Sequence, residues 1–408
     1  MNLEQSSNKR RKNMRLMNLY FFLYFAAGGF IIPFLSLYYR DIHLNGIQIG
    51  AVGTIGGLMG IIAAPFWGFI SDRSSNKRLI FQITLIISGI FMVLVGQFTL
   101  FWMVTALYAS HRFWSASNIA TAENLAFRIA KPSGDGKKNG FGSMRLWGSL
   151  SWAVTSLLGG WLIVRLAIQV NMLAYAAFCT LAAFLLFFIS KESFKAEEHL
   201  EKEDHKGGSV LRMILTDKYL LLMVAALALT NPLGNGIRQF EPIYMIELGI
   251  SESLIGTAAM LSAFIEVPFM FWADHLIIRF GISKVLIIVF FLDLVRRLLV
   301  WIFPFGWVVF GMQVAMSVTL SLRLVTAVNM VNQRVPQKYT TTTLALITVT
   351  IFGISNMISS ALSGVVYEIF SGRELYLMSA VGCLISLALA LYAAFIQKKE
   401  PCYSQDPT

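Results

Sequence analysis

The residues that could do chemistry are charged side chains inside long apolar segments. An ionisable group in a hydrocarbon layer costs about 2.5–3.5 kcal/mol on insertion scales, so each one should face a partner or a watery cavity. The chain of 408 residues carries such groups at Arg112, Glu123, Arg145, Arg238, Glu241, Glu266, Asp293, Arg296, Arg297 and Arg323. An acid beside a guanidinium can pair with it and then open to the polar groups of a solute. The carboxyl group of such an acid can also take up and release a proton.

The composition shows which elements must position these charges. Hydrophobic residues make up 56% of the chain and charged residues 13%, with a mean hydropathy of +0.66. Since a soluble domain has about 25% charged residues, a water-soluble globule is excluded. Runs of about 20 apolar residues, the length that crosses a bilayer, begin near Leu16, Ile47, Leu79, Phe98, Phe141, Asn171, Tyr219, Leu254, Val285, Phe305, Thr341 and Leu375.

These twelve runs are continuous rather than short and alternating, which favours helices over a lipid-facing barrel. The sequence therefore predicts an all-α integral membrane protein with twelve transmembrane helices. The boundaries at Gly96 and Gln97 and at Pro304 are the least defined, and ten or eleven spans is the alternative.

A polar stretch divides the runs into six and six. It predicts an N-terminal bundle over residues 1–190, a cytoplasmic linker over 191–218 and a C-terminal bundle over 219–408. The cysteines Cys179, Cys383 and Cys402 have no pairing or metal spacing, so we expect no disulfide framework, no metal and no cofactor.

The positive charges predict the orientation. With the N-terminus inside, the outer loops hold only Arg40, Arg165 and Arg373, while the cytoplasmic segments hold the other loop lysines and arginines. Both termini are therefore expected in the cytoplasm, in the cell membrane, with no signal peptide. This asymmetry explains the net charge of +11 without a nucleic-acid partner. A small-molecule substrate, protons and the lipid bilayer are the expected partners of a monomer.

The loop after the second run carries a known pattern. Gly68-Phe69-Ile70-Ser71-Asp72-Arg73 followed by Lys77-Arg78 resembles the loop signature of the major facilitator superfamily. A degenerate copy, Asp274-His275-Leu276-Ile277-Ile278-Arg279, stands at the equivalent place in the second half. The resemblance implies two six-helix bundles that alternate around a central cavity, with Gly68, Asp72, Arg73 and Asp274 acting in conformational gating.

A narrower resemblance lies in the fifth run. Arg145-Leu146-Trp147-Gly148-Ser149, followed by Trp152, resembles the lactose permease and phenylpropionate permease-like group, as does Glu123 late in the fourth run. The resemblance implies that Glu123 and Arg145 hold the substrate and that a proton gradient drives import. A permanent structural ion pair is the alternative.

Other residues could complete a substrate site. Arg112 lies eleven residues before Glu123, near three helical turns, so both are expected on one helix face; its alternative is an arginine that snorkels to the outer surface. Trp147 and Trp152 could stack on a ring or anchor at the interface. Arg238 is spaced to pair with Glu241, just after Pro232 and its neighbouring glycines, in a gate or a packing kink.

A second set could couple to protons. Besides Glu123, the group comprises Glu266, whose burial would favour its protonated form, and Asp293, Arg296 and Arg297. Asp293 can reach an arginine three or four residues ahead on its own helix, which would leave the other for Glu266. A purely structural network is the alternative.

The sequence also departs from the pattern of that group. Arg323 is the only ionisable residue between Trp307 and Asn329, where a histidine and a glutamate are expected, and Phe352 stands near an expected lysine. Proton coupling therefore depends on Glu123 or Glu266, and an added cavity arginine favours anionic or strongly polar solutes.

The predicted function is import of a small organic solute, a sugar or an aromatic acid, by proton symport. Efflux by proton antiport is the alternative, disfavoured because Ser156 to Gly160 lacks the Gly-Pro typical of such antiporters. A membrane enzyme or sensor ranks lower, because the histidines are scattered and no phosphate-binding loop occurs.

Overall fold

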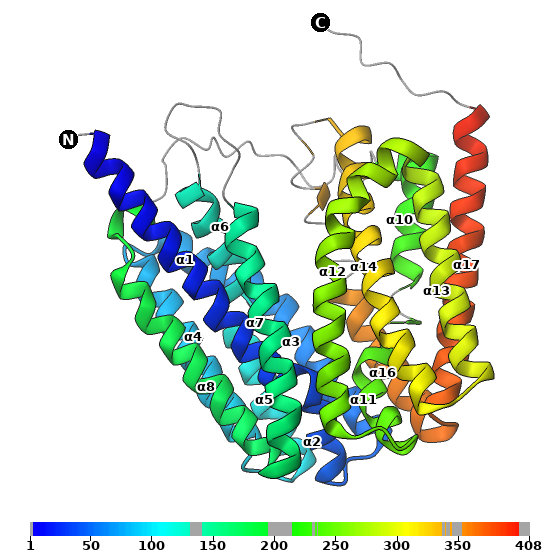
Figure 1. The fold of residues 1–408 in the computed structure, drawn as a ribbon, viewed down its shortest axis with the longest axis horizontal. Coiled ribbons are helices and arrows are strands. Elements are labelled where there is room, and N and C mark those ends of the chain that lie inside the picture. Colours follow the sequence, from blue (N-terminus) through cyan, green and yellow to red (C-terminus); the bar gives the residue numbers. More distant parts are fainter. Residues whose placement is uncertain are drawn as a thin grey trace, which may run out of the picture. The chain divides into compact units, whose positions relative to one another are not determined.

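The computed structural model describes residues 3–130, 141–194, 214–230, 233–234, 236–336, 339, 343–344 and 353–399, and the side chains in these ranges except those of residues 3–7, 72 and 398–399. Every regular element in this part of the chain is a helix, as the sequence predicts (Figure 1). The segments 195–213, in the predicted linker, and 345–352, with Phe352, lie outside it.

The first part of the chain forms long helices with short connections. They are α1 (Leu3–Ile31), η1 (Ile32–Phe34), α2 (Leu35–Asp41), α3 (Gly46–Arg73), α4 (Lys77–Val95), α5 (Phe101–Ser115), α6 (Asn118–Ala130), α7 (Phe141–Arg165), α8 (Ile168–Leu185), η2 (Leu186–Phe188) and η3 (Lys191–Phe194). Pro33 interrupts the first segment, because proline cannot donate to the preceding turn. Asn45 starts α3 with a reciprocal cap, in which its Oδ1 accepts from Gln48 N at 2.9 Å.

The second part repeats this style of construction. Its helices are α10 (Lys218–Thr230), α11 (Gly236–Glu247), α12 (Glu252–Phe280), α13 (Ile282–Ile302), α14 (Gly306–Arg334), α16 (Ser355–Ile369) and α17 (Gly372–Lys399). Gly281, at φ 81°, joins α12 to α13 in a conformation that a side chain would strain.

Among the described residues, eight helical segments are long and apolar enough to cross a membrane: Asn8–Asp41, Gly46–Ser71, Lys77–Val95, Phe141–Arg165, Ile168–Phe188, Glu252–Phe280, Gly306–Arg334 and Gly372–Gln397. The other four predicted runs fall on the interrupted pairs α5–α6 and α10–α11, on the charged helix α13 and on α16. Both doubtful boundaries are confirmed, because α4 and α5 are separate helices and so are α13 and α14.

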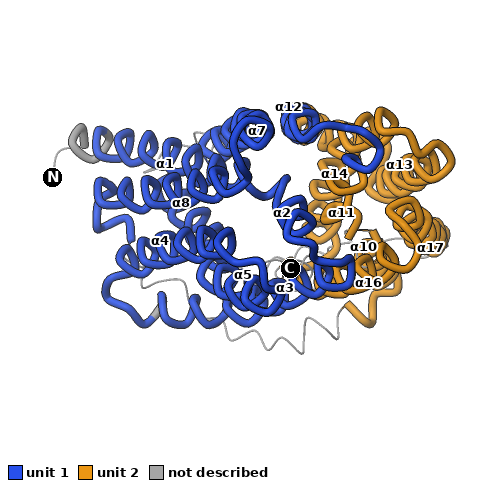
Figure 2. The backbone as a smooth tube through the Cα atoms, turned by 90° about the horizontal axis from the view of Figure 1, so that it is seen from below, with its two compact units in different colours: residues 1–201, 245–264 blue, residues 202–244, 265–408 orange. Residues whose placement is uncertain are grey.

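The chain forms two compact units, coloured separately in Figure 2. Unit 1 comprises residues 1–201 and 245–264, and unit 2 comprises 202–244 and 265–408. The chain first passes from unit 1 to unit 2 between residues 201 and 202, inside the predicted linker 191–218. Residues 245–264 group with unit 1.

The packing within each unit follows the same plan. In unit 1, α4 packs on α5 and α8, and α1 packs on α7 and α8. In unit 2, α13 packs on α14 and α17, and α10 packs on α17. When the helices of each unit are numbered as membrane spans, the third span packs on the fourth and the sixth in both units. The first span packs on the sixth in both units as well. This is the repeat that the two loop motifs predict.

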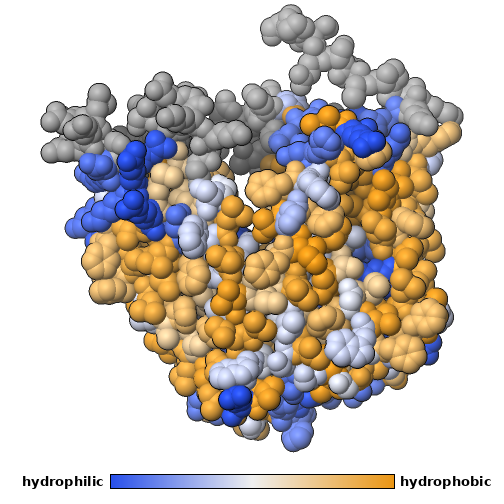
Figure 3. All heavy atoms as spheres, viewed as in Figure 1, coloured by the Kyte–Doolittle hydropathy of each residue, from blue (hydrophilic) through white to orange (hydrophobic). Residues whose placement is uncertain are grey.

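Each unit has an apolar core, and it also exposes apolar side chains. The core of unit 1 includes Met17, Phe21 and Leu85, and that of unit 2 includes Met223 and Phe290. The face shown in Figure 3 is largely hydrophobic, with hydrophilic side chains gathered toward its ends. Exposed apolar surface of this extent suits a hydrocarbon surrounding rather than water.

Candidate functional site

An acid and an arginine meet in unit 1, as the sequence predicts. Glu123 on α6 and Arg145 on α7 form an ion pair, with 3.8 Å between Glu123 Oε1 and Arg145 Nε. The side chains are 38% and 36% exposed, so neither is sealed in the core. The spacing is longer than a charge-assisted hydrogen bond, which is about 2.7–2.9 Å. The pair is loose and reachable.

A glycine on α7 brings an aromatic ring under this arginine. The guanidinium carbon of Arg145 lies 4.0 Å from the centroid of the Phe25 ring on α1. A Cβ added at Gly148 would lie 2.6 Å from a carbon of that ring, so only glycine lets α7 approach α1 here. The ring holds the cation over its face by a cation–π interaction and limits where Arg145 can turn.

Arg112 lies on α5, and Glu123 lies on the next helix, α6. A two-residue turn separates α5 from α6, so continuous helical spacing alone does not fix the relation of Arg112 to Glu123, and their shared face stays a prediction. Arg112 packs over α3, where a Cβ at Gly60 would lie 3.2 Å from its Nη2. The electrostatic surroundings of Tyr24 on α1 include all three of Arg112, Glu123 and Arg145.

The two tryptophans of α7 lie on different faces. Trp147 is 45% exposed and shares its face with exposed Leu146, Leu150 and Val154. Trp152 packs on α1, where a Cβ at Gly28 would lie 2.8 Å from its ring. Five residues on a helix correspond to a rotation of about 140°, which explains the separation. The structure thus brings Trp152, and not Trp147, to the side of α7 that faces α1.

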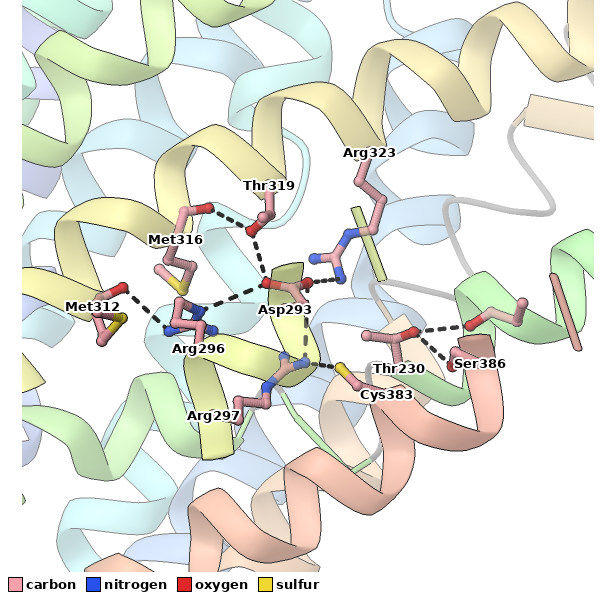
Figure 4. A network of polar contacts seen from close by, with 11 residues as sticks. Thr230, Asp293, Arg296, Arg297, Met312, Met316, Thr319, Arg323, Cys383 and Ser386 are labelled. Carbon is pink, nitrogen blue, oxygen red and sulfur yellow. Dashed lines mark hydrogen bonds and ion pairs between the residues drawn. The ribbon is translucent and has the colours of Figure 1, made fainter. Parts of the chain in front are cut away.

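A second group of charges lies in unit 2 (Figure 4). Asp293 on α13 contacts Arg296 and Arg297 of its own helix at 3.6 and 3.9 Å, which confirms the predicted local pairing. Arg323 on α14 joins them, with its Nη1 3.6 Å from Asp293 Oδ2. Thr319 donates its hydroxyl to Asp293 Oδ1 at 2.7 Å. Arg296 and Arg297 both contact Asp293, whereas one of them was expected from the sequence to remain available for Glu266.

This cluster is buried. The side chains of Asp293, Arg296 and Arg297 are 3–5% exposed, and that of Arg323 is 12% exposed. Arg297 also donates to the thiol of Cys383 on α17, and Arg296 Nη1 lies 3.4 Å from the carbonyl of Met312. The cluster therefore ties α13 to α14 and α17.

Glu241 hydrogen-bonds to a tyrosine, whereas its sequence spacing predicted a local pair with Arg238. Its Oε1 accepts the hydroxyl of Tyr376 on α17 at 2.7 Å, in a fully buried contact. It interacts electrostatically with Arg296 first, and more weakly with Arg238. Glu266 is half-buried on α12, and its backbone carbonyl accepts from Ser321 at 3.2 Å.

The predicted gating residues lie in the last two turns of α3 and α12. Gly68 is on α3, and a Cβ added to it would meet no described atom within 4 Å. Arg73 lies over the ring of Phe69, 3.8 Å from its centroid. The backbone of Asp72 belongs to α3, while its side chain is outside the described residues. Asp274 accepts from Asn329 Nδ2 at 3.2 Å, which links α12 to α14.

Comparison with known proteins identifies the family. A sequence model of the MFS_1 like family matches residues 14–378. The chain belongs to this family. Its major facilitator fold is confirmed, and it is a multi-pass membrane transporter rather than an enzyme.

Relatives and a solved structure agree at this level. The maltose permease of Geobacillus stearothermophilus is 27% identical over 380 residues, which covers 91% of this chain and 93% of that one. The multidrug resistance protein MdtG of Yersinia enterocolitica is 27% identical over 64% of this chain and 65% of its own length. The crystal structure of the nucleoside transporter NupG superposes with a TM-score of 0.78 at 14% identity, over 95% of this chain and all of that one, and this likeness concerns the fold alone.

Within this transporter, several contact residues were not found from the sequence. Phe25, Thr319, Tyr376 and Cys383 are ordinary apolar or small polar residues in apolar runs, and nothing local distinguishes them. Arg323 was visible as an ionisable residue, but the packing of α14 on α13 decides its partner. Among the described residues, no group of three or more His, Cys, Asp or Glu could hold a metal.

Proposed function

We propose that the protein is a secondary active transporter that imports a small organic solute, a sugar or an aromatic acid, by alternating access with proton symport. The observation that carries the proposal is the loose, half-exposed pair of Glu123 and Arg145. A solute with hydroxyl or carboxylate groups can replace each member of such a pair with little loss. Trp152, which packs on α1, and Arg112, which packs on α3, would add a ring face and a further donor.

The relatives support import over efflux. The maltose permease aligns along nearly all of both chains, whereas the multidrug resistance protein aligns along about two thirds. The latter supports a second candidate, export of a drug or metabolite. The two candidates differ in the direction of net movement when cells are energised.

Glu123 is the proposed proton carrier, with Glu266 as the second carboxylate. Asp293 is a poorer carrier, because its protonation would leave three buried arginines without their shared counter-charge. Asp293, Arg296 and Arg297 then act on coupling through the packing of α13 against α14. Trp147 and Arg238 remain proposed solute contacts that the pair itself does not require.

Uptake into proteoliposomes tests the proposal. Radiolabelled maltose and radiolabelled phenylpropionate are offered with and without an imposed inward proton gradient. We expect the gradient to drive accumulation of one of them, and Glu123→Gln or Arg145→Gln to abolish it while the protein still inserts.

Asp41→Asn is the matched control, since Asp41 pairs with Arg40 at a similar 3.9 Å in unit 1 and is 57% exposed. Accumulation by Glu123→Gln with an unchanged pH profile would show that Glu123 is not the coupling residue. Accumulation of the solute inside energised inside-out vesicles, which corresponds to export from the cell, would favour the efflux candidate.

The location and the gating are proposed on the charge pattern. The protein is placed in the cell membrane with both termini in the cytoplasm, and terminal reporter fusions that are active only outside test this. Gly68, Asp72, Arg73 and Asp274 are proposed to latch the closing bundles. Asp72→Asn should slow the cycle, measured as turnover, without changing the ranking of competing solutes.

A further inference from the structure

A small cavity in unit 2 is lined by more positive than negative charge. Its volume is about 20 Å³, and its walls include Gly234, Arg238, Asp293, Arg296, Arg297 and Arg323. Glu241 is the other acid, and it interacts electrostatically with Arg238, Arg296 and Arg297. Four guanidinium groups against two carboxylates leave a formal charge of +2 (four minus two) among these described side chains.

The arginines also have unused donors. Arg296 and Arg297 are 5% and 4% exposed, and in the described part of the chain the Nε of each has no hydrogen-bond acceptor. Nη1 of Arg323 likewise has no hydrogen-bond acceptor among the described residues. Figure 4 shows the three guanidinium groups turned toward Asp293 from different sides. The three guanidinium groups lie 3.6–3.9 Å from Asp293, farther than a hydrogen bond, so they keep donors for a second acceptor.

A helix end adds to the positive potential. Ile237 and Arg238, in the first turn of the twelve-residue helix α11, line the cavity. Backbone amides of a first turn have no partner within the helix, and the dipole is positive there. Gly234 lets the chain approach the arginines, because a Cβ at this position would lie 2.8 Å from Nη2 of Arg297. In transporters, the ends of interrupted helices serve such anionic groups.

We propose that this cavity is an anion site and that it binds a carboxylate of the transported solute. The volume suits one water-sized atom, so a single carboxylate oxygen would enter while the rest of the solute stays outside. This inference rests on the proposed function, and it narrows the solute to an organic acid. A halide ion has the same charge and a suitable size, so the test must distinguish a solute carboxylate from a bound halide.

Matched acids and neutral compounds test the site in the full-length protein in lipid nanodiscs. The pairs are phenylpropionate with its amide, and glucuronate with glucose. We expect at least one acid to raise the unfolding temperature while its neutral partner does not. Arg323→Gln should weaken the apparent affinity for that acid about 10-fold or more, because it removes one buried partner of the carboxylate.

Arg373→Gln is the matched control, since Arg373 lies in the same unit but donates to the carbonyl of Trp301, away from the cavity. It should bind the acid as the unchanged protein does. If Arg323→Gln fails to fold, Arg238→Gln replaces it, because Arg238 makes no ion pair with Asp293 among the described contacts.

Three binding results would overturn the inference. The first is equal binding of an acid and its neutral partner, and the second is equal affinity for the acid in Arg323→Gln and Arg373→Gln. The third is that sodium chloride stabilises the protein more than sodium isethionate does and that the acid cannot displace the chloride. The assay uses no gradient, so it does not depend on direction or coupling. Uptake of neutral maltose alone would refute this inference and leave the proposed transport intact. Acid binding without any uptake would refute the proposed transport and leave an anion site that serves no transported solute.

Discussion

The charged sites of the two units are built differently. In unit 1, one acid faces one arginine, and both side chains are more than a third exposed. In unit 2, one aspartate serves three arginines, and its own side chain is 3% exposed. The first site is open, whereas the second is buried and has an excess of positive charge.

This difference separates a contact that can be exchanged from one that holds helices together. An exposed pair contributes about 0–1 kcal/mol to stability, so a solute can open it at small cost. A buried pair is costly to break, because the remaining charge stays in a medium of low polarity. We infer that unit 1 exchanges partners during the cycle, while unit 2 keeps Asp293 in place and presents spare donors.

The largest effect is expected at Asp293. Asp293→Asn leaves three arginines without their shared carboxylate and should lower the free energy of unfolding by about 3–5 kcal/mol. The midpoint of thermal unfolding in detergent measures it. Asp41→Asn is the control and should change stability by less than about 1 kcal/mol, since its partner is solvated. Equal effects of the two substitutions would remove the distinction between the sites.

A smaller loss is expected at the Tyr376 hydroxyl. Tyr376→Phe removes the donor to Glu241 and leaves a buried carboxylate oxygen short of one hydrogen bond, at a cost of about 1–3 kcal/mol. Tyr392→Phe on the same helix is the control, because Tyr392 is 56% exposed. Denaturation of both variants side by side measures the difference. No loss in Tyr376→Phe would mean that Glu241 is satisfied without it.

The sequence predicted the helices well, because apolar length and interruptions are local properties. The break before Gly236 was predicted from Pro232 and its glycines, and it is confirmed between α10 and α11. The break between α5 and α6 was missed, since no proline or glycine marks it. There Asn118 Oδ1 accepts from Thr84 of α4 at 2.8 Å, a contact made across the bundle.

The sites were predicted only as far as local spacing reaches. Asp293 with Arg296 and Arg297 follows from helical periodicity, and Glu123 with Arg145 from the resemblance. The third arginine, Arg323, and the ring of Phe25 depend on how helices pack against each other. One sequence carries no register between helices, so these partners could not be read from it.

Gly148 gives a way to alter the first site without touching its charges. Gly148→Ala places a Cβ 2.6 Å from the Phe25 ring, and such overpacking costs about 1–3 kcal/mol. The better helix propensity of alanine offsets about 1 kcal/mol of this. Gly142→Ala, on the same helix with no described atom within 4 Å, is the control. Solute affinity should fall in Gly148→Ala alone, because a displaced ring no longer holds Arg145.

The smallest effect on stability is expected at Glu123, and it accompanies the largest effect on transport. Glu123→Gln keeps the size of the side chain and removes one charge of an exposed pair, so the free energy of unfolding should change by less than about 1 kcal/mol. Arg145 retains its contact with Phe25, which keeps the cation in place. Thermal unfolding and solute binding measured on the same preparation separate the two effects. A loss of stability as large as that of Asp293→Asn would show that the pair holds α6 to α7 permanently, since an exchangeable contact cannot be one on which the fold depends.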